Sequence, residues 1–145
     1  MTTLPYIPAE LQEDMSQSLF QLALLVDDYD KALRYFTNTL GFELLEDTRL
    51  SPDKRWVRIA PKGNGGAYLL LARAANDEQR QAVGNQSGGR VFLFLHTNDI
   101  YRDVAAYKSR GVTFIREPER YEYGIAAVFE DLYGNKWDLI EPATE

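Results

Sequence analysis

The feature that most constrains the fold of this chain is an internal repeat, in which one strand, one helix and three strands follow one another twice. In the first copy, a strand-like apolar run at residues 19–26 leads into Asp27-Asp28, which is an N-cap signal for a helix. The apolar residues of that helix recur on one side, and Gly41 is suited to end it. Three more strands are predicted at residues 42–46, 56–60 and 67–72.

The second copy repeats this order with few identical residues, so the repeat is defined by its pattern. A strand at 91–96 precedes a cap at 97–99 and a helix that Gly111 ends. Three strands are again predicted, at residues 112–116, 125–130 and 136–141. We therefore expect one structural domain made of an N-terminal arm at 1–17, a first module at 18–72, a linker at 73–89 and a second module at 90–145.

Composition excludes several classes of protein. A chain of 145 residues with 45% hydrophobic and 26% charged residues fits one folded domain. Its net charge of -6 and its scattered basic residues argue against a nucleic-acid surface, which needs clustered cations. No apolar run approaches the ~20 residues that span a bilayer. The absence of Cys excludes disulfides and thiolate chemistry, and the N-terminal residues do not resemble a signal peptide, so we expect a cytoplasmic protein without a membrane partner.

Several motifs, taken together in their order and spacing, point to a known family. In the first copy, Val-Asp-Asp-Tyr-Asp-Lys-Ala-Leu-Arg-Tyr-Phe at 26–36 precedes Leu-Gly-Phe at 40–42. In the second, Arg-Gly-Val-Thr-Phe at 110–114 precedes a turn at 131–135 and Trp-Asp-Leu-Ile-Glu at 137–141. Over residues 19–142 the chain resembles the vicinal oxygen chelate superfamily of glyoxalases, bleomycin resistance proteins and dioxygenases. The resemblance implies an α+β fold in which two βαβββ modules form a curled mixed sheet cup, with the helices outside. It also implies a homodimer and a small-molecule ligand.

Strand alternation predicts which side chains line this cup, because successive residues of a strand face opposite sides of the sheet. The predicted pocket is largely aromatic and apolar, which is typical of a small-molecule site. Its polar members are Gln21, Arg58, Tyr68, His96 and Asp138. Its other members are Trp56, Phe92 and Phe94, and Tyr123 is a candidate gate at the entrance.

The usual metal site of the family is incomplete in this chain. The resemblance implies metal ligands at the positions of Gln21, Phe92 and Asp138, and Phe92 replaces the imidazole expected there. An amide and a single carboxylate bind a transition metal weakly. We therefore predict no cofactor and assign no metal ligand; a divalent metal at Gln21 and Asp138 remains the alternative.

Two functions follow from this pocket. In the first, the protein is a glyoxalase-like lyase or isomerase acting on an oxygen-rich small molecule. His96 or Asp138 would move a proton, and Arg58 would fix an anionic group with Gln21, Trp56, Tyr68, Phe92, Phe94 and Tyr123 binding the substrate. In the second, it is a non-catalytic binding protein like the drug-sequestering members, and its acidic, aromatic character suits a cationic aromatic ligand.

Each of these residues also has a purely structural alternative. His96 would then face solvent, Gln21 would only hydrogen-bond within the sheet, and Asp138 would pair with Lys136 or Arg58. Trp56 and Tyr123 would serve in packing.

Overall fold

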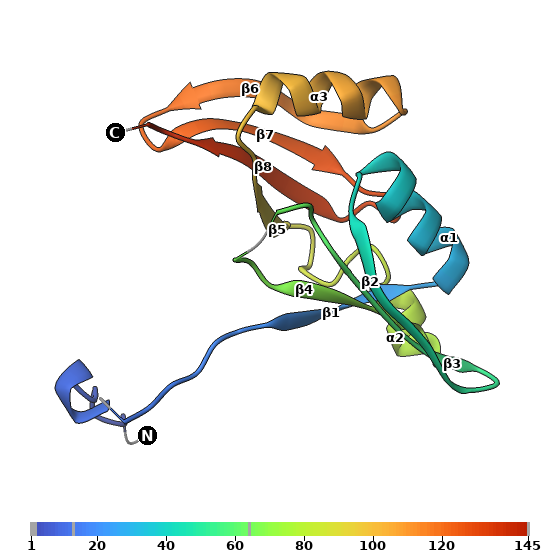
Figure 1. Ribbon diagram of the computed structural model, residues 1–145, viewed down its shortest axis with the longest axis horizontal. Helices are drawn as coiled ribbons and strands as arrows, with labels where there is room; N and C mark the ends of the chain where they lie inside the picture. Colours follow the sequence, from blue (N-terminus) through green and yellow to red (C-terminus); the bar gives the residue numbers. More distant parts are fainter. Residues whose placement is uncertain (1–2, 13, 64, 145) are drawn as a thin grey trace.

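The computed structural model describes residues 3–12, 14–63 and 65–144, and it contains two modules of the predicted kind (Figure 1). The first module consists of β1 (Gln21–Val26), α1 (Tyr29–Arg34), the π-helical turn η2 (Tyr35–Thr39), β2 (Glu43–Ser51), β3 (Lys54–Ala60) and β4 (Tyr68–Arg73). The second consists of β5 (Val91–His96), α3 (Ile100–Ser109), β6 (Thr113–Tyr121), β7 (Gly124–Glu130) and β8 (Lys136–Pro142). Outside the modules lie η1 (Ala9–Gln12) in the arm and α2 (Asp77–Ala82) in the linker.

Each module forms its own four-stranded mixed sheet, and the strand orders are equivalent: β1-β4-β3-β2 and β5-β8-β7-β6. The first and last strands of each module pair in parallel, and the other pairs are antiparallel. The predicted α+β fold of two βαβββ modules is therefore confirmed. The sheets are curled but separate, and they do not close into a barrel.

The local signals for the helices also act as predicted. Asp28 and Asp99 cap α1 and α3 by accepting hydrogen bonds from the backbone N–H groups of Lys31 and Arg102. Gly41 and Gly111 follow the helices with φ values of 77° and 88°, which glycine adopts without the strain that a Cβ brings. The first helix differs from the uniform α-helix of the pattern, because it changes to a π-helical turn at Tyr35.

Two strands are longer than the sequence predicts. The strands expected at 42–46 and 112–116 extend to Ser51 and Tyr121 in β2 and β6. Most side chains of both strands are exposed, so they lack the alternation of apolar and polar residues that marks a half-buried strand.

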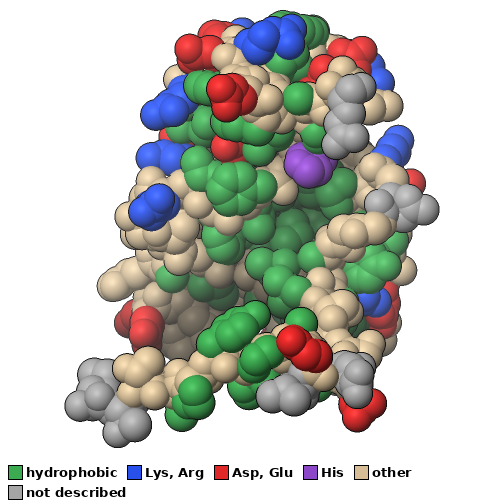
Figure 2. Space-filling model, turned by 90° about the vertical axis from the view of Figure 1, so that its left-hand side faces the viewer, with side chains coloured by type: hydrophobic (Ala, Val, Ile, Leu, Met, Phe, Trp, Pro, Cys, Tyr) green, Lys and Arg blue, Asp and Glu red, His purple; other side chains and the backbone are tan. Residues whose placement is uncertain are grey.

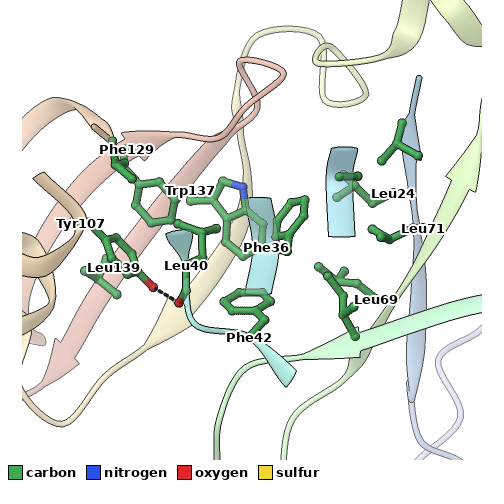
Figure 3. Close-up of a cluster of buried hydrophobic side chains, with 14 of the residues drawn as sticks. Leu24, Phe36, Leu40, Phe42, Leu69, Leu71, Tyr107, Phe129, Trp137 and Leu139 are labelled. Carbon is green, nitrogen blue, oxygen red and sulfur yellow. Dashed lines mark hydrogen bonds between the residues drawn. The ribbon is translucent and has the colours of Figure 1, made fainter. Parts of the chain in front are cut away.

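One core holds the two modules together (Figure 3). The covered faces of the two sheets and the apolar sides of α1, η2 and α3 all contribute to a single buried cluster. Trp137 of the second module lies against Phe36 and Phe42 of the first, with ring centroids 6.1 and 5.8 Å apart. Because this aromatic contact is shared, neither module has a complete core of its own.

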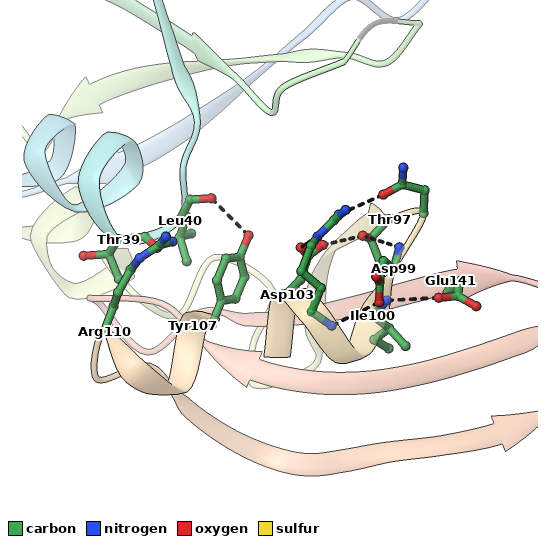
Figure 4. A network of polar contacts seen from close by, with 11 residues as sticks. Thr39, Leu40, Thr97, Asp99, Ile100, Asp103, Tyr107, Arg110 and Glu141 are labelled. Atoms are coloured by element: carbon green, nitrogen blue, oxygen red, sulfur yellow. Dashed lines mark hydrogen bonds and ion pairs between the residues drawn. The ribbon is translucent and has the colours of Figure 1, made fainter. Parts of the chain in front are cut away.

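Polar contacts add to the junction between the modules. Tyr107 of α3 donates its hydroxyl hydrogen to the carbonyl oxygen of Leu40 at 3.1 Å, and Arg110 donates to the carbonyl oxygen of Thr39 at 3.1 Å (Figure 4). At the opposite end of the first module, the Tyr133 hydroxyl donates to Asp27 at 2.7 Å. These contacts fix how the two sheets sit relative to one another.

The linker covers the outer edge of β1. The side-chain amide of Gln86 accepts from the Leu25 N–H at 2.7 Å and donates to the Ala23 carbonyl at 3.2 Å, as a neighbouring strand would. This contact protects part of an otherwise open sheet edge. In the part of the chain that the structure describes, no helix has the length and apolar character needed to cross a membrane.

Candidate small-molecule site

Each sheet buries one face in the core and leaves the other face outside it. We call the side of the first sheet that carries Gln21, Trp56, Arg58 and Tyr68 the first open face. On β3 the intervening residues Val57 and Ile59 are fully buried, so the predicted alternation holds. The side of the second sheet that carries Phe94, His96, Arg116 and Asp138 is the second open face. Phe94 pairs with Asp138 across β5 and β8. Val128 of β7 pairs with both Asp138 and Arg116, so all of these residues lie on one side of the second sheet.

Arg58 organises the first open face. Its Nε donates to the Gln21 Oε1 at 2.7 Å, and its Nη1 lies 3.4 Å from the Glu46 Oε1. The guanidinium carbon lies 5.1 Å from the centre of the Tyr68 ring, within the range of a cation–π contact. The Arg58 side chain is only 22% exposed, so the guanidinium is held in place by three neighbours. Its remaining N–H groups can donate to an oxygen of a ligand.

Asp138 is the corresponding polar group of the second open face. Its Oδ1 is buried and has no hydrogen-bond partner among the described residues. Burial raises the pKa of Asp138, and the nearby positive charge of Arg116 lowers it in part. A buried acceptor without a partner is costly, and such exceptions in a native fold often mark a functional group. The sequence suggested Lys136 or Arg58 as a structural partner of Asp138. Instead, Lys136 donates to the Gly89 carbonyl oxygen, and Arg58 pairs with Glu46.

Phe94 and His96 flank this carboxylate along β5. Phe94, the cross-strand neighbour of Asp138, is 68% exposed, which is unusual for a phenylalanine on a sheet face. His96 is also exposed and pairs with Ile140, so it lies on the same open face but is not hydrogen-bonded to Asp138. Phe94 thus offers an apolar surface beside a buried carboxylate.

Two predicted site residues, Phe92 and Tyr123, are placed differently from the others. Phe92 was expected to face the cup, but it packs against the buried core. The reason is an irregularity in the pairing of β5 with β8 between Val91 and Leu93, which interrupts the alternation of side chains. Tyr123 lies in the turn at the end of the β6–β7 hairpin. Its ring stacks on that of Tyr121, with the ring centroids 5.3 Å apart. Trp56 lies on the first open face, opposite Thr48 of β2.

The expected convergence of all polar groups in one cup is not found within the chain. Gln21 lies on the first sheet and Asp138 on the second, and the two sheets are not joined. Local alternation predicted the face of each residue, but it contains no information on how the sheets are placed. Alternation also gives no indication of Glu46 and Arg116, because both lie on long strands whose exposed residues have no clear periodicity.

The sequence predicted a concave cup, and a hollow lies between the two sheets, lined in part by Tyr68, Phe94 and His96 of the predicted site (Figure 2). This inter-sheet hollow has a volume of about 500 Å³, and its surface is mainly apolar. Its floor includes residues of both modules: Leu22, Phe42, Leu69, Leu93 and Trp137. Lys62, Tyr68 and His96 are its ionisable lining residues.

The residues at the family's metal positions do not fit a metal ion. The Gln21 amide oxygen already accepts a hydrogen bond from a guanidinium cation, which would repel a second cation. Within the described ranges, no three His, Cys, Asp or Glu residues cluster as a metal site requires. We therefore assign no step to a metal.

The fold defines a class of protein in which two βαβββ modules each bury one sheet face and leave the other open. Residues 18–139 match the Glyoxalase/Bleomycin resistance protein/Dioxygenase superfamily, and the chain belongs to that family.

Similar proteins agree with this assignment. An uncharacterised protein of Shewanella frigidimarina (strain NCIMB 400) is 52% identical over 128 residues, which cover 88% of this chain and 95% of that protein. A superfamily member from Sphaerobacter thermophilus DSM 20745 has a solved structure that is 32% identical, with a TM-score of 0.73 over 87% of this chain and 98% of the other. TnmS3, an antibiotic-binding protein from Streptomyces sp. CB03234, is 29% identical, with a TM-score of 0.71 over 88% of this chain and 98% of its own.

Proposed function

We propose that this protein binds an aromatic, oxygen-bearing small molecule on its open sheet faces and holds it without a metal. The observation that carries the proposal is the hydrogen bond from Arg58 to Gln21, a residue at which the resemblance to the family implies a metal ligand. This arrangement replaces a metal with a fixed guanidinium, which binds carboxylates and other oxygen groups through paired N–H donors. The family membership and the structural similarity to an antibiotic-binding protein support a binding role.

The two open faces offer complementary contacts to such a ligand. Trp56 and Tyr68 on the first face and Phe94 on the second present aromatic surface on which a flat ring can stack. Arg58 supplies hydrogen-bond donors. Burial raises the pKa of Asp138, so a negative charge is more costly at this position than in water. The Arg58 guanidinium favours an aromatic ligand with an anionic group, whereas the net charge of the whole chain had suggested a cationic one.

We further propose that the working form is a homodimer. One chain presents two half-sites on separate sheets, so a second copy can place its second open face against the first open face of its partner.

A lyase or isomerase activity is the second candidate, and Asp138 is the observation that favours it. An unpaired carboxylate oxygen on an open face, with a raised pKa, is a suitable group to accept or donate a proton. In this case Arg58 would hold the substrate oxygen while Asp138 moves the proton.

A thermal-shift screen with defined probes tests these proposals. The probes are 2-naphthoate, catechol, a cationic acridine dye and the hemithioacetal of methylglyoxal and glutathione. We expect 2-naphthoate to raise the Tm, and we expect Arg58→Met to weaken its binding at least tenfold, as measured by Trp fluorescence titration. Arg120→Met, an exposed arginine of β6, is the matched control and keeps the affinity of the wild type. If the Arg58 variant binds 2-naphthoate as tightly as the wild type, the proposed role of Arg58 is wrong.

Proton NMR of the bound probes separates binding from catalysis. A probe that is recovered unchanged after hours supports the binding function. If the wild type converts the hemithioacetal and Asp138→Asn does not, the result supports an enzymatic function. Conversion that persists in Asp138→Asn would contradict the catalytic role given to this residue.

A further inference from the structure

The first sheet divides at one end into two pairs of strands. The pairing of β3 with β4 ends at Val57 and Leu71. Beyond that point, residues 54–56 of β3 stay paired with β2, and residues 72–73 of β4 stay paired with β1. The facing edges of these two segments are not paired with each other, so their backbone polar groups can bond to a ligand or to water. In Figure 1 the tip of the β2–β3 hairpin projects beyond the other strands of the sheet.

A cavity of about 600 Å³ lies at this division, and we call it the split cleft. It is lined by the first residues of β3, by the end of β4 and by residues of the 74–80 segment, which leads into α2. None of its lining residues lines the inter-sheet hollow, and with the first open face it shares Trp56. Pockets for small molecules have volumes of about 300–1,000 Å³, so the split cleft has the size of a ligand site.

The charge of the split cleft is opposite to that of the chain as a whole. The net charge of the chain is -6. The split cleft is lined by one acidic side chain, that of Asp53, and by four basic side chains, those of Lys54, Arg55, Arg73 and Arg80. A cleft lined mainly by one sign of charge raises the local concentration of ligands of the opposite sign. The split cleft therefore favours an anion.

Three of these basic side chains can bind a ligand. In the part of the chain that the structure describes, Lys54 and Arg73 have no ion-pair partner, and both residues are exposed. Arg80 pairs with Asp77 at 2.7 Å, but both side chains of this pair are exposed. Exposed ion pairs contribute little to stability, so the anionic group of a ligand can replace Asp77.

The fourth basic side chain, that of Arg55, is fixed in the wall of the split cleft. It donates from Nε and Nη2 to Asp47 and from Nη1 to Asp30. Its guanidinium carbon lies 5.2 Å from the centre of the Tyr29 ring. Because two carboxylates already match its charge, Arg55 shapes the wall and leaves the binding of an anion to the other three.

The rest of the wall is apolar and aromatic. Leu70, Leu71 and Ala72 of β4 line the split cleft together with Trp56 of β3, which is half-buried. An indole ring in this position offers an apolar face on which a flat ring can stack. The split cleft thus combines an aromatic contact with three available cations.

We propose that the split cleft is a second ligand site, which takes a small molecule with a flat aromatic ring and a phosphate group. Trp56 contacts the ring, and Lys54, Arg73 and Arg80 contact the phosphate oxygens. A phosphate monoester carries about two negative charges and three acceptor oxygens, which match three separate cations better than a carboxylate does. The inference goes beyond the proposed function and does not depend on it, because the anion-binding residues differ from Arg58.

Isothermal titration calorimetry with 1-naphthyl phosphate tests the site on the full chain. The titrations use Arg58→Met protein, so that the first open face cannot hold the anion. In this background we expect Arg73→Met to weaken binding at least tenfold, because it removes the charge and keeps an unbranched side chain. Lys54→Met should act in the same direction. Arg120→Met, at an exposed position of β6, is the matched control and keeps the affinity.

Two related probes test the two parts of the ligand. Inorganic phosphate lacks the ring and 1-naphthol lacks the anion, so each should bind at least tenfold more weakly than 1-naphthyl phosphate. Inorganic phosphate that binds as tightly as 1-naphthyl phosphate would contradict the contact with Trp56. Equal affinities of the Arg73→Met protein and its parent for 1-naphthyl phosphate would overturn the proposal.

Amide NMR of the wild-type protein locates the probe without any substitution. We expect 1-naphthyl phosphate to shift the amide signals of Ala72 and Ala74, which line the split cleft, and to leave that of Leu95 in the inter-sheet hollow unchanged. Shifts confined to the hollow or to the open faces would overturn the proposal.

The two proposals fail separately. Binding of 1-naphthyl phosphate at the split cleft by a protein that does not bind 2-naphthoate would contradict only the proposed function. Binding of 2-naphthoate that depends on Arg58, without any binding of 1-naphthyl phosphate, would contradict only the second ligand site.

Discussion

The two modules of this protein share one fold but differ in the chemistry of their open faces. Leu71 and Leu139 occupy equivalent positions on β4 and β8, and both are buried. On the open faces, Arg58 is held by Gln21, Glu46 and Tyr68, whereas the buried Oδ1 of Asp138 has no hydrogen-bond partner in the described structure. Packing against a common core constrains the covered faces, and the open faces are free to carry different groups.

The modules also differ in the connection before their last strands. In the second module Asp131 is buried and accepts hydrogen bonds from the backbone of Tyr133 and Asn135 and from the indole of Trp137. In the first module the corresponding connection is rich in glycine, and its described residues 61–63 and 65–67 line the inter-sheet hollow. One connection therefore serves as a rigid turn, and the other borders a cavity.

The equivalence of the covered faces predicts the largest effects on the free energy of unfolding. Leu71→Ala and Leu139→Ala should each reduce the free energy of unfolding by about 3 kcal/mol, because each removes a fully buried side chain. Since the modules share one core, both variants should keep a single transition in urea, followed by circular dichroism and Trp fluorescence. Leu50→Ala, an exposed position of β2, is the control and should change stability by less than about 0.5 kcal/mol. Two separate transitions would show that the modules unfold independently.

The difference between the two connections predicts the next effect. Asp131→Ala should cost about 2 kcal/mol, because four donors near a buried site, including the Asn135 side-chain amide, lose their acceptor. Asp53→Ala, in the exposed turn between β2 and β3, should have little effect. Urea denaturation measures both variants, and equal losses would mean that the buried network does not stabilise the turn.

The unpaired carboxylate predicts a gain in stability. Asp138→Asn should raise the free energy of unfolding by about 1 kcal/mol at pH 7, because it removes a charge from a desolvated position. The pKa of Asp138 is higher in the folded state than in the unfolded state, where it is about 4. The protonated carboxyl group therefore stabilises the folded state at low pH. This contribution to the free energy of unfolding is lost as the pH rises through the folded pKa.

The difference between variant and wild type should therefore grow as the pH rises through that window. The pKa values of Asp27 and Asp47 are lowered chiefly by hydrogen bonds from Lys31 and Arg55, so these two residues stop stabilising the folded state as the pH falls below the same window. Wild type and variant share this effect, so it cancels in the difference between their free energies of unfolding. A pH-independent difference would show that Asp138 is not desolvated in the folded state.

The smallest expected effect concerns the junction between the modules. Tyr107→Phe removes the hydrogen bond to the Leu40 carbonyl and should cost about 1 kcal/mol. Burial, with a smaller contribution from the charge of Asp103, raises the pKa of Tyr107 to about 12, so the hydroxyl keeps its proton over the working range. Tyr101→Phe on the same helix, where the ring is exposed, is the matched control. If the two variants unfold at the same urea concentration, the junction does not depend on this bond.

Much of the candidate site followed from the sequence, because strand alternation is a local property. It predicted one shared cup, and the structure confirms that Gln21, Arg58 and Tyr68 lie on one side of their sheet and that Phe94 and Asp138 lie on one side of theirs. It failed at Phe92, where an irregular pairing interrupts the alternation. It also gave no sign of the bond between Arg58 and Gln21, which are 37 residues apart in the chain.

The sequence by itself determined the order of the elements, the caps at Asp28 and Asp99 and the covered face of each strand, because each depends on a few neighbouring residues. Only the tertiary structure decided that the sheets stay separate, that Gln21 and Asp138 lie on different sheets and that a hollow opens between them. These features depend on the packing of Trp137 against Phe36 and Phe42, residues from both modules. Contacts over such distances in the chain are set by the free energy of the whole core, and no local pattern encodes them.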